Sequence, residues 1–115
     1  MAHYAEVITG IVARVVVVSN DVTTIDGVED EQRGVDFLDA ILPTAGAWVQ
    51  TSYHASMRHN YAGSGYTWDG TGFAEPQPYG SWTLDENYVW QPPTPIPDDG
   101  TNYTWDEASA SWVQA

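Results

Sequence analysis

The sequence contains no cysteine and no lysine, and three arginines are its only strongly basic residues. The lack of cysteine excludes disulfide bonds and thiolate metal sites. Sixteen acidic residues against three arginines give a formal net charge of −13. Proteins bind nucleic acids and anionic membranes mainly through clusters of Lys and Arg, so we expect neither as a partner.

Long apolar runs are missing as well. The longest one, Val15 to Val18, is far too short to cross a bilayer. Residues 1–6 lack the basic start of a signal peptide. At 115 residues the chain has room for a single domain with one modest core.

The first strands of the chain are predicted from its β-branched residues. Residues 4–8 and 11–18 are separated by Thr9-Gly10, which supplies a turn, so they predict a hairpin. Residues 11–18 are almost continuously β-branched. This composition predicts a strand that is covered on both faces and lies at the centre of the sheet.

One helix is predicted over residues 29–42. Its apolar positions recur at spacings of three and four: Val35, Leu38, Ile41 and Leu42. Acidic residues at its start suit the helix dipole, and Pro43 ends it, although Gly34 inside it costs about 1 kcal/mol. Residues 48–53 read as a third strand. Residues 1–58 therefore predict a small β-β-α-β subdomain with one helix, in a chain of the α+β class.

Residues 59–115 differ in character, being rich in glycine, proline and aromatic residues. A pattern of aromatic, Thr, large apolar residue and Asp occurs at 66–69, 82–85 and 103–106. Each Asp can accept hydrogen bonds from backbone amides two residues ahead and so open a turn. We therefore predict no helix here but a series of three β-hairpins.

Proline-rich segments separate these hairpins, at residues 76–78 and 92–97, and predict extended, semi-rigid connections. A lone two-stranded hairpin is marginally stable in water. The hairpins are therefore expected to pack against one another, against residues 1–58 or against a partner.

Four segments together resemble a family of small acidic proteins of marine tailed phages, cyanophages above all: residues 1–6, 48–53, 58–69 and 97–107. The chain departs from that pattern at His59, where Lys is common, and in a short linker after Tyr53. The resemblance covers most of the chain and implies a virion component. It implies no reaction.

No constellation in the sequence predicts catalysis, a metal site or a cofactor. His3, His54 and His59 match no tight metal-binding spacing, and residues 98–102 read as a turn rather than a calcium loop. The acidic pairs fall at predicted turns, where solvent keeps their two pKa values alike. Arg58 is expected to pair with an acid of the C-terminal half or to be solvated. The chain is therefore predicted not to be an enzyme.

Aromatic residues of the second half are the predicted site. About half of them should face outward from alternating strands, beside carboxylates, as in protein interfaces and glycan-stacking sites. The alternative is that they form the core, because this half has few aliphatic residues. The predicted partner-binding residues are Tyr66, Trp68, Trp82, Trp90, Tyr103, Trp105 and Trp112.

These observations and the resemblance together predict a structural or accessory protein of a phage virion. Such a protein is made in the host cytoplasm and binds capsid or tail proteins as a decoration, neck or tail component. A homo-oligomer or a virion-bound form is expected. Two alternatives remain: a glycan-binding module like a tail-fibre tip, and an acidic decoy that mimics DNA.

Overall fold

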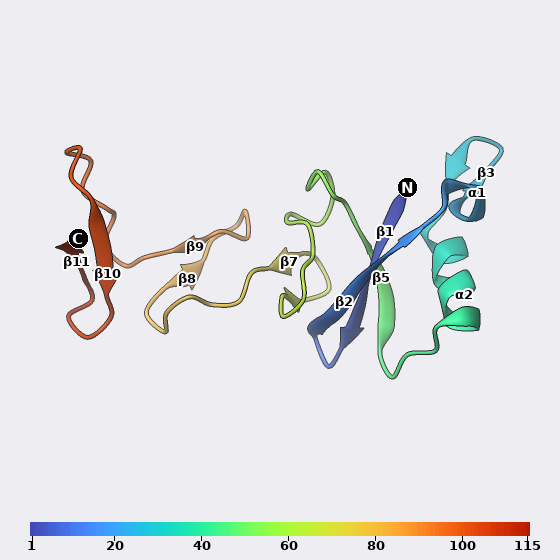
Figure 1. Ribbon diagram of the computed structural model, residues 1–115, viewed down its shortest axis with the longest axis horizontal. Coiled ribbons are helices and arrows are strands. Elements are labelled where there is room, and N and C mark those ends of the chain that lie inside the picture. The colour runs from blue at the N-terminus through green and yellow to red at the C-terminus, as the bar shows by residue number, and fades with distance from the viewer. The chain divides into compact units, whose positions relative to one another are not determined.

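The structure is a computed structural model that describes residues 1–115, and the chain divides into two compact units, Met1–Pro76 and Gln77–Ala115 (Figure 1). The predicted α+β class is confirmed: two helices and eleven strands in antiparallel sheets, beginning with β-β-α-β. In unit 1 the elements are β1 (Ala2–Ile8), β2 (Ile11–Val18), α1 (Asn20–Thr23), β3 (Thr24–Ile25), β4 (Val28–Glu29), α2 (Glu31–Ile41), β5 (Ala47–Thr51), β6 (Thr67–Trp68) and β7 (Phe73–Ala74). In unit 2 they are β8 (Thr83–Leu84), β9 (Trp90–Gln91), β10 (Tyr103–Asp106) and β11 (Ser111–Gln114).

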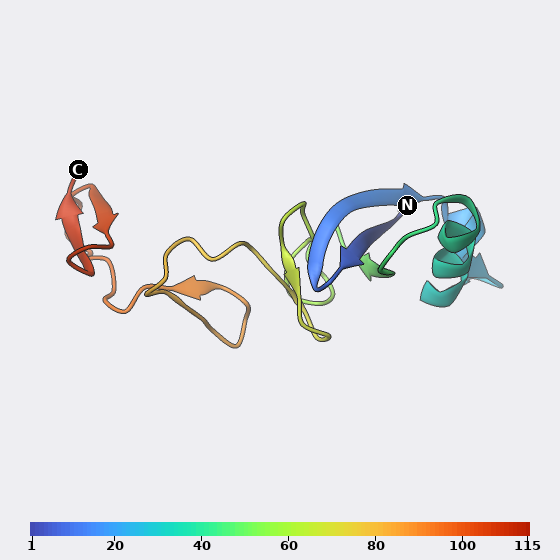
Figure 2. The same cartoon turned by 90° about the horizontal axis from the view of Figure 1, so that it is seen from below.

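Unit 1 is built on a five-stranded sheet in the order β5-β1-β2-β6-β7. The predicted turn at Thr9-Gly10 is confirmed, because both residues have positive φ, 53° and 77°, and Ile8 pairs with Ile11. Two consecutive residues of positive φ match the right-handed twist of the strands they join. Helix α2 packs against one face of the sheet, near the C-terminal end of β2 (Figures 1 and 2).

The strand that is covered on both faces is β1, not β2. Every residue of β1 is buried or half-buried, because Ala2 and Tyr4 pack in the core cluster that contains Leu38 of α2, whereas Ala5 and Val7 pack in the cluster on the opposite face. In contrast, β2 pairs with β6 only through Ile11, and Val17 is 51 % exposed. As predicted, β2 is the central strand of the five. The prediction that both of its faces are covered was wrong, because β-branched residues favour any pleated surface, including a half-covered one.

Helix α2 begins two residues later than predicted and ends one residue earlier. Asp30 is its N-cap and accepts a hydrogen bond from the Gln32 amide at 3.0 Å. Gly34 lies directly over Tyr4 of β1, whose hydroxyl donates to the Glu31 carbonyl at 3.0 Å. Neither helix has the length and apolar content that a bilayer crossing needs.

Residues 19–29 contain short elements that the sequence did not reveal. Ser19 caps α1 by accepting from the Asp21 amide, and α1 packs beside α2. Strands β3 and β4 then form a minimal hairpin around Asp26-Gly27, both of positive φ. Glu29, which the sequence placed in the helix, ends β4 instead.

All three predicted hairpins are present, and no helix follows residue 41. They are β6–β7, β8–β9 and β10–β11. The first belongs to the sheet of unit 1 and the other two form unit 2, so residues 59–76, grouped with the second half in the sequence, lie in unit 1.

Candidate functional site

The seven aromatic residues predicted to bind a partner are divided between the two units. Tyr66 and Trp68 lie in unit 1, where both pack against the core beneath β6 and β7. The centres of the Trp68 and Phe73 rings are 4.6 Å apart. The guanidinium carbon of Arg58 lies 5.4 Å from the centre of the Trp68 ring. These two residues are therefore mainly packing material of the sheet.

Three of the remaining aromatic residues, Trp82, Trp105 and Trp112, form a cluster in unit 2. Trp105 and Trp112 are cross-strand partners on β10 and β11, with ring centres 5.2 Å apart. The Trp82 ring packs edge-on against both, at 5.8 and 6.1 Å. Tyr79, which the sequence did not single out, adds a fourth ring 5.6 Å from Trp82. Such tilted and edge-to-face pairs are the preferred aromatic geometries.

Glu107 connects two segments of this cluster through hydrogen bonds. It accepts hydrogen bonds from the Trp105 indole at 2.8 Å and from the Ser81 hydroxyl and amide at 2.6 and 3.0 Å. The hydroxyl of Ser81, and next the indole of Trp105, lower the pKa of Glu107 from its ordinary value. The carboxylate therefore joins the segment before β8 to the turn after β10.

An apolar groove of about 390 Å³ lies beside the cluster. It is lined by Trp82, Gln91, Pro92, Pro95, Ile96 and Trp112. The Trp112 indole donates to the Thr94 carbonyl at 2.7 Å and so holds the proline segment against the rings. Ile96 is 53 % exposed, and the Trp82 indole nitrogen is buried without an acceptor. The groove thus combines half-covered indole rings with proline rings.

A scan against protein-family models finds no match, and neither a search of the curated proteins nor one of the solved structures finds any.

Trp90 and Tyr103 belong to unit 2 but do not line the groove. Trp90 is half-buried on β9. The Tyr103 hydroxyl donates to Asp99 at 2.7 Å, which raises the pKa of Tyr103. Of the predicted residues, the structure therefore brings Trp82 and Trp112 to the groove, with Trp105 supporting them from the core of the unit.

The proline segment supplies three groove residues that were not among the predicted site residues. Pro92, Pro95 and Ile96 were predicted to be extended and semi-rigid only. Two proline rings in an extended segment present flat apolar faces. This feature of the sequence could have indicated that the segment contributes to a binding site.

Aspartates hold the turns by the predicted mechanism at two of three positions. Asp69 accepts from the Thr71 amide at 2.8 Å, and Asp85 accepts from the Asn87 amide at 2.8 Å. The amide of Val89 contributes most to lowering the pKa of Asp85. Asp106 differs, because it accepts from the Ser109 hydroxyl at 2.6 Å instead of from an amide. These carboxylates serve the backbone of their own turns.

Histidines line a second, more polar cleft, of about 370 Å³, in unit 1. His3 and His54 both lie there, each against the Tyr53 ring, with centres 6.0 and 5.2 Å away. No group of three or more His, Asp or Glu side chains is placed to hold a metal ion. The cleft is therefore a cluster of aromatic and polar contacts.

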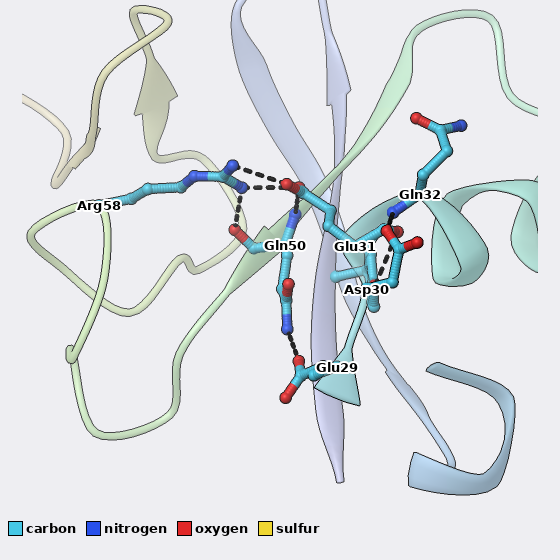
Figure 3. A network of polar contacts seen from close by, with 7 residues as sticks. Glu29, Asp30, Glu31, Gln32, Gln50 and Arg58 are labelled. Carbon is cyan, nitrogen blue, oxygen red and sulfur yellow. Dashed lines mark hydrogen bonds and ion pairs between the residues drawn. The ribbon is translucent and has the colours of Figure 1, made fainter. Parts of the chain in front are cut away.

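Arg58 binds Glu31, within the same half of the chain (Figure 3). Both guanidinium nitrogens Nη1 and Nη2 donate to the Glu31 carboxylate at 2.7 Å. The expected pairing with the C-terminal half, and the solvated alternative, were both wrong. The sequence separation of 27 residues concealed the contact, which depends on α2 and the segment after β5 meeting at the sheet edge.

This ion pair also covers the outer edge of β5 at Gln50. Glu31 accepts from the Gln50 amide at 2.7 Å, and Arg58 donates to the Gln50 carbonyl at 2.7 Å. The Gln50 side chain donates to Glu29 (Figure 3). Hydrogen bonding to Arg58 lowers the pKa of Glu31 from its ordinary value of 4.5. Together the two charged side chains satisfy the amide and the carbonyl of Gln50, which a neighbouring strand would otherwise use.

Tyr4 makes unit 1 sensitive to alkali. Burial, and then the negative charge of Glu31, raises the pKa of Tyr4 from 10.0 to about 12. A raised pKa means that the folded state holds the proton more tightly, so stability is full below pH 10 and falls as the pH rises toward 12. We expect this alkaline loss in denaturant titrations of the natural chain and a flatter profile for Tyr4→Phe. A profile that Tyr4→Phe leaves unchanged would show that another group is responsible.

Proposed function

We propose that this chain is a non-enzymatic structural or accessory protein of a tailed-phage virion, a capsid decoration, neck or tail component. In this proposal it attaches to a neighbouring virion protein through the groove of unit 2. The groove beside Trp82 and Trp112 is the observation that carries the docking role. The virion setting rests on the sequence resemblance alone.

The size of unit 2 favours a partner. It spans Gln77–Ala115 and contains no cysteine. Folding units below about 40 residues usually need a disulfide, a metal or association with another chain. The first is excluded by the sequence, and no candidate metal cluster is present. Cover from another protein surface would stabilise such a unit.

The charge of unit 2 indicates the chemistry of that partner. Its only ionisable side chains other than tyrosines are acids: Asp85, Glu86, Asp98, Asp99, Asp106 and Glu107. A segment that carries Lys or Arg would be attracted to this surface, whereas an acidic segment would be repelled. The groove volume suits one or two apolar side chains. The partner segment that fits is therefore extended, basic, and anchored by an aliphatic, aromatic or proline side chain.

Glycan binding is the second candidate, favoured by the half-exposed indole rings of Trp82 and Trp112. Sugars stack on such rings without needing a positive charge. Binding of a neutral glycan that quenches tryptophan fluorescence, unchanged by salt, would support this candidate over a basic protein segment. The DNA-mimic alternative has less support, because Asp69 and Asp85 are used in their own turns.

Ile96 offers a test that leaves the aromatic cluster intact. It lines the groove and is 53 % exposed, whereas Val89 is similarly exposed at 49 % but lies outside the groove lining. We expect the natural chain in purified virions by mass spectrometry, severalfold less incorporation for Ile96→Ser, and normal incorporation for Val89→Ser. Absence of the natural chain from virions would refute the virion role. Equal incorporation of both variants would refute the groove as the attachment site.

A further inference from the structure

The outer edge of β2 is open over most of its length. Next to the turn it is covered, because the Val12 amide donates to the Tyr66 carbonyl and the Gly65 amide donates to the Val12 carbonyl, both at 2.8 Å. The Ser64 hydroxyl then donates to the Ala13 carbonyl at 3.2 Å. Residues 14–18 pair with β1 on their inner side and have no backbone partner on the outer side.

The outer sides of the two strands that flank β1, which are β5 and β2, are thus covered differently. At β5 the Glu31–Arg58 pair satisfies the amide and carbonyl of Gln50. At β2 no such side-chain pair is present beyond Ala13. Unpaired backbone groups along a strand edge are a template for another strand, and natural proteins usually block them with Lys, Pro, bulges or covering loops. Strand β2 has a bulge at Ala13, because Glu6 pairs with Arg14 and Val7 pairs with Val12. The bulge precedes residues 14–18 and so does not block their outer edge.

The side chains of this edge are nearly uncharged. Arg14 is the only charged residue among residues 14–18. Its Nε lies 3.0 Å from the Glu6 carboxylate, and its guanidinium carbon lies 5.5 Å from the centre of the Trp48 ring. Four valines follow, of which Val17 is half-exposed. Valine is favoured in strands, and cross-strand pairs of β-branched side chains stabilise a sheet.

We propose that a second copy of this chain binds here, with the two β2 strands antiparallel about a two-fold axis at Val16. Val16 is the centre of the open stretch, so residues 14–18 of one copy would lie against residues 18–14 of the other. Such an isologous contact closes on itself and joins the two sheets into one. Strand β2 contains no acidic residue, so it would not attract the basic segment that suits unit 2. Its uncharged run of valines is instead complementary to the same run in a second copy.

Net charge predicts how salt affects this dimer. Each copy carries −13, so the copies repel one another at long range, and salt screens that repulsion. Dimerisation should therefore strengthen as salt is added. Binding of a basic segment to unit 2 should weaken under the same change, and this opposite response separates the two contacts.

Single-cysteine variants test the proposed register, because the chain has no other thiol. Only a residue on the two-fold axis faces its own copy, where a non-hydrogen-bonded antiparallel pair places the Cα atoms about 4.5 Å apart, within disulfide range. Under mild oxidation we expect Val16→Cys to form a disulfide-linked dimer. Val15→Cys, Val17→Cys and the distant Val113→Cys should link severalfold less.

Light scattering of unmodified chains completes the test. We expect the natural chain to dimerise at high salt and Val17→Glu to stay monomeric, because it places two like charges close to the axis. Val113→Glu makes the same change at a half-exposed valine on β11 and should dimerise like the natural chain. A natural chain that is monomeric at every salt concentration, or a dimer that Val17→Glu leaves intact, would overturn the proposal. Linking by Val113→Cys as efficient as by Val16→Cys would overturn it too.

Discussion

Replacing Gly34 by alanine is expected to lower the free energy of unfolding of unit 1 by about 1–3 kcal/mol, the usual cost of overpacking a core. At an exposed helical position the same change would raise stability by up to about 1 kcal/mol. Here the added Cβ would lie 2.1 Å from the Tyr4 hydroxyl oxygen and 2.3 Å from its Cζ. Tyr4 is fully buried beneath α2, so its ring has no space to move away.

A second substitution shows whether Tyr4 is the cause. Tyr4→Leu removes the ring atoms that the new Cβ would meet, at a cost of its own. If the close approach is correct, Gly34→Ala costs much less in the Tyr4→Leu background than in the natural chain. Denaturant unfolding of the four chains measures this coupling, and equal costs in both backgrounds would contradict it.

Replacing Arg58 by methionine is expected to destabilise unit 1 by about 1–3 kcal/mol. Removing one partner of a fully buried ion pair costs roughly 3–5 kcal/mol. The Arg58 and Glu31 side chains are 29 % and 34 % exposed, so solvent reduces that figure. The substitution also leaves the Gln50 carbonyl without its donor.

The dependence of the unfolding free energy on acidic pH tests whether the ion pair is the cause. The lowered pKa of Glu31 means that the contribution of the pair is complete above pH 4.5 and is lost as the pH falls further. Arg58→Met should therefore reduce the acid dependence of stability. Arg33→Met, which removes a guanidinium bonded only to the Val22 carbonyl, should leave that dependence in place. A full acid dependence in Arg58→Met would exclude Glu31 as its source.

Local patterns in the sequence were enough to predict most of the elements. The spacing of Leu38 and its apolar neighbours gave α2, and the Thr9-Gly10 turn gave the first hairpin. The repeated Asp gave the three later hairpins, because a carboxylate that bonds amides two residues ahead acts within a few residues. Features that depend on distant partners were missed: the pairing of Arg58 with Glu31 and the open outer edge of β2. The two-residue strands β3 and β4 were too short to show any periodicity.

The candidate site was predicted in part for the same reason. Composition pointed to aromatic residues of the second half, and Trp82 and Trp112 line the groove. Which rings face a groove and which support a sheet depends on packing, and this placed Trp68 against Phe73 in unit 1. The contribution of Ile96 depends on the proline segment lying beside Trp112, which the Thr94 carbonyl secures.

A peptide titration measures whether the groove of unit 2 binds a basic segment with an apolar anchor. Tryptophan fluorescence of the full chain is followed while peptides of equal apolar content, but basic, neutral or acidic, are added at low and high salt. We expect saturable fluorescence changes with the basic peptides alone. These changes should be weaker at high salt, lost in Ile96→Ser and kept in Val89→Ser. Binding that is the same for basic, neutral and acidic peptides, or that persists in Ile96→Ser, would show that the groove is not a site for basic segments.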